Sequence, residues 1–390
     1  MTDVAVIGVG QTRYGMFPDR TLKDMFHEAA REALNDVDKG LDPKDVNEAF
    51  IGTLATGGAQ LGNFAPLMME AAGMIGAGAR HLENACASSS YALRDAVAAI
   101  ASGQARIAVA AGIEKMSDLP RERNRLWLGI SGDVEWERLA GTNFAGIYAM
   151  MARRHMHDYG TTKEQITMAA VKNRNNAVKN PKAQFRSPLT IEQALKAPNL
   201  ASPFTYSDAC SITDGASMVI LCRADMARDF TDQPVLVAGS GAASDYVAVH
   251  DRPSMTRLEA TSRAAEEAYR MAGVGPDDID FAEVHDCFAM AELLAYEDLG
   301  FCQRGGAGRL MEDGVTQMDG RKPVNASGGL IGKGHPIGAT GTGQIYEVVN
   351  QLRGKARDPE RQLGNVRYGL THNVGGSGAA VAIHIFKAVE

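Results

Sequence analysis

The amino-acid sequence predicts an α/β fold made of two similar halves, with buried helices between two sheets. Two segments open alike, because VAVIGVGQT at 4–12 and VLVAGSGAAS at 235–244 are each a short β-type run containing Gly-x-Gly. A second repeated pattern follows in each half, in which a strand leads through a turn of small residues into a helix and then into another strand. At 390 residues the chain is also too long for one simple core.

The helix expected after the first small-residue turn, in ENACASSSYALRDAVAAIASG, carries small side chains all round it. Alanines on every side of a helix favour burial on every side, as between two sheets. The matching unit of the second half is VNASGGLIGKGHPIGATGTGQIYEVVNQLRG followed by VRYGLTHNVGGSGAAVAIHIF. We therefore expect one buried helix from each half in the middle of the molecule.

The Gly-x-Gly pairs do not predict a dinucleotide site. Each lacks the third glycine of that fingerprint, and no helix obviously begins there. The segment GLIGKGHPIG has Gly-Lys without a following Ser or Thr, so it is not a phosphate-binding loop either.

The stretch from about 117 to 200 differs from the rest, because it is polar and charged and holds both tryptophans. We interpret it as an insertion in the first half. The expected domains are an N-terminal half (1–116 plus 201–230), the inserted loop domain (117–200) and a C-terminal half (231–390).

Composition limits the partners. The formal net charge of −7 argues against general binding to nucleic acid or anionic membranes, and no apolar run approaches the roughly 18–20 residues of a membrane span. Five scattered cysteines without a CxxC pair make a zinc ribbon or a disulfide framework unlikely, so a reducing cytoplasm is the simplest location. Between 171 and 191 there are five basic residues and no acid, which indicates either a solvated helix face or a landing site for an anionic ligand.

Cys86 is a candidate nucleophile, because it stands where a strand gives way to a helix. Helix N-terminal N–H groups stabilise a thiolate, although free cysteines are usually inert core residues. His335 lies among the seven glycines of 328–343, where backbone and ligand can approach closely, and is a natural base for a thiol.

The segment EVHDCFAMAELL at 283–294 places His285, Asp286 and Cys287 at a strand-to-helix junction. Alternation in an extended backbone puts His285 and Cys287 on one side, while Asp286 turns away and can cap the following helix. One His–Cys pair has too few ligands for structural zinc, so acid–base chemistry fits better. The glycines of HNVGGSG at 372–378 present bare N–H groups to an oxyanion, or form a simple strand bulge.

The blocks NACASSS, VHDCFAMAELLAYEDLGFC, NASGGLIGKGHPIGATG and HNVGGSGAAV resemble the four catalytic blocks of the thiolase superfamily, in the family's order. The match spans essentially the whole chain and is most similar to the sterol-carrier-protein type of thiolase. Most thiolases have Asn-Glu-Ala-Phe where this chain has residues 285–288, and a second reactive cysteine where this chain has Asn373. The resemblance implies a five-layer αβαβα fold with the insertion as the CoA-binding loop domain.

The resemblance also implies roles for individual residues. Cys86, activated by His335, would accept an acyl group from acyl-CoA, and Cys287 would remove the α-proton of a second acyl-CoA. N–H groups of Cys86 and Gly375 would hold the thioester carbonyl, and His285 and His335 the enolate oxygen. The substrate-binding residues would include Lys182, Arg186, Ser327 and Gly328. No metal or permanently bound cofactor is implied, with coenzyme A esters as substrates.

Two functions follow from the resemblance. One is a complete acetyl-CoA C-acetyltransferase that makes or cleaves acetoacetyl-CoA. The other is a thiolase-fold subunit active only in an assembly, with a small OB-fold zinc-ribbon protein and sometimes hydroxymethylglutaryl-CoA synthase, or a divergent C–C lyase or C-acyltransferase. Family members are dimers or tetramers, and the Met-rich PLMMEAAGM at 66–74 belongs either to such an interface or to the core.

Overall fold

A mixed β-sheet of nine strands forms the centre of the fold. The computed structural model describes residues 3–389, and within them the strand order is β3-β2-β4-β7-β1-β8-β11-β10-β9. The strands of the first half are β1 (Val4–Gln11), β2 (Glu48–Gly52), β3 (Gly78–Leu82), β4 (Ile107–Glu114) and β7 (Gly215–Arg223). Those of the second half are β8 (Val235–Ser244), β9 (Phe281–Glu283), β10 (Tyr368–Gly375) and β11 (Ala380–Ala388). Strands β5 (Asn199–Ala201) and β6 (Phe204–Thr205) pair separately.

The two halves of the sheet share one pairing pattern, which confirms the predicted repeat. In the first half β2 is parallel to β4, β4 is antiparallel to β7, and β7 is antiparallel to β1. In the second half β9, β10, β11 and β8 repeat the same three relations in the same order. The halves meet along a short seam between β1 and β8, where Ala5 pairs with Leu236 and Val6 with Val235.

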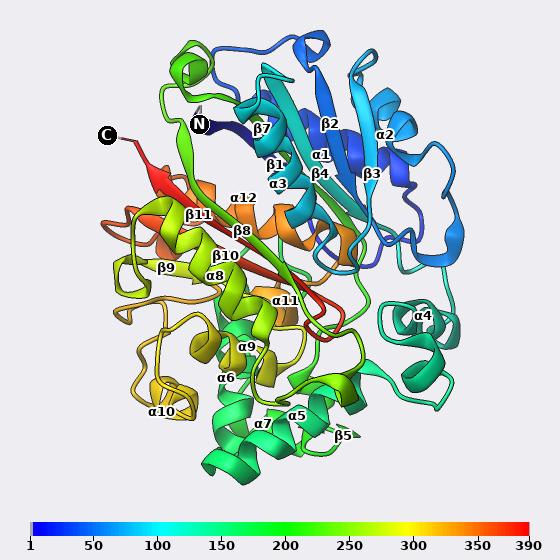
Figure 1. Cartoon of the computed structure of the whole chain (residues 1–390), viewed down its shortest axis with the longest axis vertical. Helices are drawn as coiled ribbons and strands as arrows, with labels where there is room; N and C mark the ends of the chain where they lie inside the picture. The colour runs from blue at the N-terminus through cyan, green and yellow to red at the C-terminus, as the bar shows by residue number, and fades with distance from the viewer. Residues whose placement is uncertain (1–2, 390) are drawn as a thin grey trace.

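Helices cover and separate the two halves in five layers, as predicted (Figure 1). Helices α1 and α2 pack on the outer face of the first half, and α8 and α9 on that of the second. Helices α3 and α12 lie between the halves and contact strands of both. Their bounds are α1 (Leu22–Asn35), α2 (Phe64–Ala72), α3 (Ser88–Ala101), α8 (Glu259–Ala272), α9 (Ala289–Asp298) and α12 (Thr340–Leu352).

The Gly-x-Gly pairs serve helix packing. A Cβ atom at Gly10 would lie 2.1 Å from the Ala29 carbonyl oxygen of α1, and one at Gly241 would lie 2.0 Å from the Ala264 carbonyl oxygen of α8. The glycines of β1 and β8 therefore let one helix in each half approach its strand closely. This contact explains the repeated glycines without a nucleotide.

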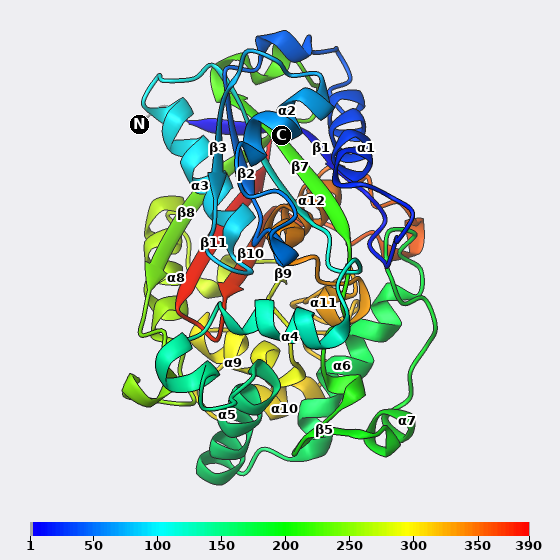
Figure 2. The same ribbon diagram turned by 90° about the vertical axis from the view of Figure 1, so that its right-hand side faces the viewer.

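Between β4 and β7 the chain leaves the sheet and forms further helices at one end of the molecule (Figure 2). They are α4 (Arg121–Gly129), α5 (Phe144–Tyr159), α6 (Lys163–Ala177) and α7 (Ile191–Lys196). Helix α6 packs against α9 and against two short helices of the second half, α10 (Ala307–Glu312) and α11 (Gly329–Gly332). The boundaries of the three predicted domains stay a prediction.

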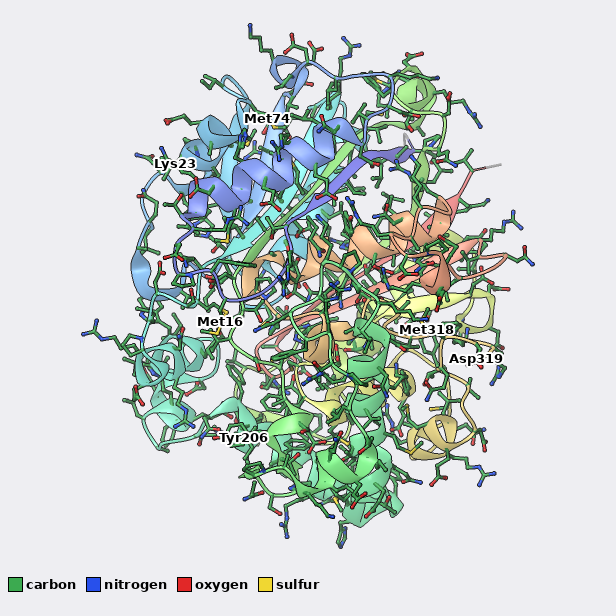
Figure 3. All side chains as sticks on the ribbon, turned by 180° about the vertical axis from the view of Figure 1, so that it is seen from behind. Met16, Lys23, Met74, Tyr206, Met318 and Asp319 are labelled. Carbon is green, nitrogen blue, oxygen red and sulfur yellow. The ribbon has the colours of Figure 1, made fainter. Side chains whose placement is uncertain are left out.

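The Met-rich segment 66–74 belongs to the core of this chain. Met68, Met69 and Met74 are buried in the cluster that α1 and α2 form with the first half of the sheet, and Figure 3 shows Met74 beside α1. Within residues 3–389, no helix has the length and apolarity needed to cross a bilayer.

Candidate active site

Cys86 lies in the turn between strand β3 and helix α3, as predicted. Ala85 adopts a left-handed backbone conformation with φ of 50°. The Ser88 hydroxyl donates to the Ala85 carbonyl at 2.6 Å and accepts from the Asn84 amide at 3.0 Å. These bonds hold the turn, and the sulfur of Cys86 faces a pocket.

His335 lies between α11 and α12, with its Nε2 atom 3.3 Å from Sγ of Cys86. Its Nδ1 atom lies 2.6 Å from the Thr340 hydroxyl oxygen, and this hydroxyl donates its hydrogen to the Pro336 carbonyl at 3.0 Å. Because a hydroxyl has one hydrogen, the network assigns the proton of neutral His335 to Nδ1. The bare Nε2 lone pair therefore faces the thiol, as a base requires.

Burial dominates the acid–base properties of this pair. It raises the pKa of the Cys86 thiol to about 12, although the Gly376 backbone amide acts in the opposite direction. Burial also lowers the pKa of His335 to about 3. The sequence predicted a thiolate stabilised by the N-terminus of a helix, and desolvation outweighs that effect here. Both groups are neutral at pH 7, so proton transfer to His335 accompanies attack by sulfur.

His285 faces the same pair. One ligand atom from each of Cys86, His285 and His335 lies within 4.8 Å of the others. The Asn373 side-chain nitrogen donates to Nδ1 of His285 at 3.0 Å, while its oxygen accepts from the Ser90 hydroxyl at 3.0 Å. Neutral His285 therefore carries its proton on Nε2, a buried atom with no hydrogen-bond partner among the described residues. Burial lowers the pKa of His285 well below its usual value, so this N–H is a neutral donor.

Cys287 lines a pocket of about 470 Å³ together with Cys86 and His335. It follows strand β9 and precedes helix α9. Its neighbour His285 lies close to Cys86 and His335, two other residues of this lining. The Cys210 amide donates to the Cys287 carbonyl at 3.0 Å, which brings a third thiol to the pocket. Burial raises the pKa of Cys287 well above the usual value of a thiol, so it is protonated at rest.

The pocket walls near Cys86 are apolar, and the opening is polar. Met116 and Ile337 belong to a small hydrophobic cluster against which Cys86 packs, and all three line the pocket. Arg125 and Tyr206 line it too but are exposed, so they mark its opening to solvent. Figure 3 shows Tyr206 in the half of the molecule formed by the helices between β4 and β7.

Asp286 points away from the pocket as predicted, but it does not cap the helix that follows it. Its carboxylate accepts from the Leu330 amide at 2.6 Å, the Ile331 amide at 3.2 Å and the Asn173 side chain at 2.7 Å. Helix α9 begins after Phe288 without a side-chain cap. Asp286 therefore anchors α11, the glycine-rich segment that leads to His335. Burial raises the pKa of Asp286 to about 7.

Asp286→Asn should consequently be harmful. An amide places N–H hydrogens where the carboxylate now accepts from two backbone amides, so we expect about 1–3 kcal/mol of lost stability and reduced turnover. Thermal melts and steady-state rates measure both effects. Asp319→Asn, at an exposed position (Figure 3), is the matched control and should change neither. Unchanged melting of Asp286→Asn would contradict the anchoring role.

The basic segment 171–191 does not line the pocket. Lys172 is fully buried with Glu292 at 2.7 Å, and Lys182 pairs with Glu32 at 2.6 Å. Lys179 pairs with Glu360, Arg174 lies over the Phe185 ring at 4.4 Å, and the Arg186 guanidinium donates to the Val178 carbonyl. The three lysines thus tie the segment to acidic residues elsewhere in the chain, whereas the two arginines make contacts within the segment. The segment is therefore neither a free anion site nor simply a solvated face.

His285 is absent from the pocket lining, and three more predicted residues lie outside it too. Ser327 donates through its amide and hydroxyl to buried Glu283, and Gly328 packs so closely on Ala177 that a Cβ would lie 2.5 Å from it. Gly375 ends β10 opposite Ala380, and the residue that reaches the pocket is its neighbour Gly376. The oxyanion role expected for the Gly375 N–H stays a prediction.

A thiol with a histidine base, a histidine N–H donor and a second thiol, at the junction of a five-layer αβαβα fold, define an enzyme of covalent acyl transfer. Residues 4–225 match the family description "Thiolase, N-terminal domain", and residues 241–388 match "Thiolase C-terminal domain-like". The chain belongs to the thiolase family.

Similar proteins agree with this assignment. The chain is 46% identical to the acetyl-CoA acetyltransferase of Methanothermobacter thermautotrophicus, over 99% of this chain and 100% of that one. It is 31% identical to sterol carrier protein 2 of Gallus gallus, over 97% of this chain and 70% of the relative. The solved structure of the Ltp2-ChsH2(DUF35) aldolase matches with a TM-score of 0.86 at 26% identity, covering 99% of this chain and 98% of that one. The predicted thiolase resemblance is confirmed, and the protein is a thiolase-type acyltransferase that uses coenzyme A esters.

Proposed function

We propose that the protein catalyses the reversible Claisen condensation of two acetyl-CoA to acetoacetyl-CoA through an acyl group on Cys86. The observation that carries the proposal is the 3.3 Å contact between Cys86 Sγ and a bare Nε2 of His335, with a second thiol, Cys287, in the same pocket. One thiol forms the acyl-enzyme and the other moves the α-proton.

In the first half-reaction the Cys86 sulfur attacks the thioester carbonyl while its proton passes to His335. The carbonyl oxygen becomes negative and is held by backbone N–H groups near Cys86, for which Gly376 is better placed than Gly375. The intermediate then expels coenzyme A as a thiolate, which takes the proton of Cys287. This step leaves acyl-Cys86, a protonated His335 and a Cys287 thiolate.

In the second half-reaction the Cys287 thiolate removes an α-proton from the second acetyl-CoA. The enolate oxygen accepts from the Nε2–H of His285 and from the proton now on Nε2 of His335. The enolate carbon attacks acyl-Cys86, and the Cys86 thiolate leaves and regains its proton from His335. All three groups return to their starting protonation states, and cleavage of acetoacetyl-CoA by coenzyme A is the same path reversed.

Arg125 replaces Lys182 and Arg186 as the proposed contact for the phosphates of coenzyme A. It is an exposed cation on the pocket lining, whereas Lys182 is held by Glu32 and Arg186 lies elsewhere. Helix α4 of the inserted segment supplies it, so this segment keeps its predicted part in binding coenzyme A.

Arg125→Gln should raise KM for coenzyme A esters by about three- to five-fold at low salt, since an exposed charge contact contributes at most about 1 kcal/mol. The difference from the wild type should shrink as salt screens the phosphate. Arg186→Gln, also at an exposed arginine, is the matched control and should leave KM unchanged. A rise in KM for Arg186→Gln alone would restore the original assignment.

A second candidate function is that of a subunit active only in an assembly. The similar aldolase structure is named for two proteins, Ltp2 and ChsH2(DUF35). This pairing supports the proposal that the present chain also has a partner. The partner proposed here is a small OB-fold zinc-ribbon protein, with hydroxymethylglutaryl-CoA synthase as a further member and a homodimer or homotetramer as the core. A cytoplasmic location and a reaction without metal or bound cofactor complete the proposal.

An assay of the purified chain with acetoacetyl-CoA and coenzyme A separates the two candidates. Formation of two acetyl-CoA per acetoacetyl-CoA consumed supports the complete enzyme. Acylation of Cys86 by acetyl-CoA without turnover would instead support the subunit. Absence of both acylation and turnover would contradict thiolase chemistry and favour the divergent lyase.

A further inference from the structure

Tyr148 brings a hydroxyl to the centre of the pocket that the reaction described above does not use. It lies on helix α5 and is 1% exposed, yet it lines the pocket together with Cys86 and Cys287. Tyr148 and Cys287 line the same pocket, and the Tyr148 hydroxyl, as a hydrogen-bond partner, lowers the pKa of the Cys287 thiol. It also donates to the Gly376 carbonyl at 3.4 Å, which is longer than usual for such a bond, so the bond is weak.

The ring of Tyr148 is held in place by stacked aromatic residues. It stacks on Phe288 with ring centroids 4.9 Å apart and an interplanar angle of 28°. Phe288 in turn stacks on Phe204 at 5.7 Å and 20°. Because Phe288 directly follows Cys287 in the chain, the same contact that fixes the ring fixes its hydroxyl relative to the Cys287 sulfur.

Cys287 needs a donor in this position. When it becomes a thiolate it is a buried anion, and such an anion is costly without a hydrogen bond. Its neighbours Cys210, Cys86 and Asp286 all raise the pKa of Cys287, whereas Tyr148 lowers it. Burial raises the pKa of Tyr148 well above its usual value, so its hydroxyl keeps its hydrogen and stays a donor.

The hydroxyl has one hydrogen and two possible acceptors, and the acceptor changes with the state of Cys287. While Cys287 is a thiol, it donates to the tyrosine oxygen and the tyrosine hydrogen goes to Gly376. When Cys287 has lost its proton, the weak 3.4 Å bond is exchanged for a bond to the thiolate, which is charge-assisted and stronger. Turning about one C–O bond suffices for this change.

We propose that Tyr148 is a positioning residue for the proton transfer at Cys287, whose thiolate its hydroxyl stabilises during carbon–carbon bond formation and cleavage. The proposal rests on the proposed thiolase reaction, in which Cys287 moves the α-proton. Because Tyr148 lies on helix α5, the inserted segment would then take part in the proton transfer as well as in the binding of coenzyme A.

Tyr148→Phe keeps the stacked ring and removes only the hydroxyl. The acylation burst of Cys86 with acetyl-CoA should stay within about twofold of the wild type, because the departing coenzyme A thiolate can take its proton from water when Cys287 gives up its own less readily. The kcat for acetoacetyl-CoA cleavage should fall about ten- to hundred-fold with little change in KM, as for loss of a hydrogen bond to a charged group. Tyr269→Phe is the matched control, since it removes a hydroxyl that donates to the Leu299 carbonyl at 2.9 Å outside the pocket lining.

A double-mutant comparison tests whether Tyr148 acts through Cys287. Tyr148→Phe should have no further effect on α-hydrogen exchange or cleavage in a Cys287→Ala background, because the group it supports is gone. An additive loss would overturn the proposal, as would normal kcat in Tyr148→Phe alone. Loss of the burst together with turnover would also overturn it and show a role in pocket shape. Failure of the wild-type protein to cleave acetoacetyl-CoA would count against the proposed function instead.

Discussion

Cys86→Ala should abolish acyl-enzyme formation and reduce condensation and cleavage by more than about 10⁴-fold, because no other group in the pocket pairs a thiol with a base as closely. Mass spectrometry of the wild-type protein after mixing with acetyl-CoA or acetoacetyl-CoA should place the acyl group on the peptide that contains Cys86. The variant should show no acyl adduct at all.

The other cysteines make this a sharp test. Cys210 lines the same pocket, whereas Cys222 is buried in strand β7 and Cys302 lies outside the lining. Cys210→Ala is therefore the matched control, and it should keep the adduct and most of the activity. An acyl group found only on Cys210, Cys222 or Cys302 would show that Cys86 is not the nucleophile.

Much of the fold could be predicted from the sequence, because it repeats. The strand-turn-helix-strand unit around Cys86 and its echo around His335 correspond to helices α3 and α12, which fill the middle layer. The junction after β9 is compatible with the alternation, because both His285 and Cys287 lie near Cys86. The Asp286 carboxylate turns to α11 instead. Local patterns carry this information, since it depends on residues next to one another in the chain.

The ion pairs and hydrogen bonds that the sequence could not predict join residues that are far apart in the chain. The basic segment has no acid of its own, yet Lys172 and Lys182 find Glu292 and Glu32 in other parts of the chain. The target of Asp286 is two backbone amides of α11, which no side-chain pattern reveals.

The protonation of the two histidines was equally hidden. Asn373 stands where related chains were expected to have a cysteine, and its amide sets the tautomer of His285. The Thr340 hydroxyl does the same for His335. In both cases a hydrogen-bond partner decides which nitrogen carries the proton, so sequence could predict the two residues but not the state in which each one acts.

Cys287→Ala should separate the two half-reactions. The Cys86–His335 contact does not involve Cys287, so acetyl-CoA should still acylate Cys86 and release coenzyme A as a thiolate that water protonates. Carbon–carbon bond formation and cleavage should fall by about 10²–10⁴-fold, the usual loss for a missing general acid or base.

The size of that loss depends on what remains near the α-carbon. His285 carries its proton on Nε2 and uses Nδ1 to accept from Asn373, so it is no base, and the lone pair of His335 is already used by Cys86. His372 is tied to Thr261 through its Nε2 at 3.0 Å. The loss should consequently lie at the upper end of the range.

The measurement compares the acylation burst with steady-state cleavage in the wild type, Cys287→Ala and Cys86→Ala. Cys287→Ala should show a normal acylation burst without turnover, and Cys86→Ala should show neither burst nor turnover. This pair of results would support separate roles for the two thiols. Near wild-type turnover of acetoacetyl-CoA by Cys287→Ala would show that Cys287 is a bystander. The α-proton would then have to pass through another group, and the protonation assigned to His285 would be the first point to revise.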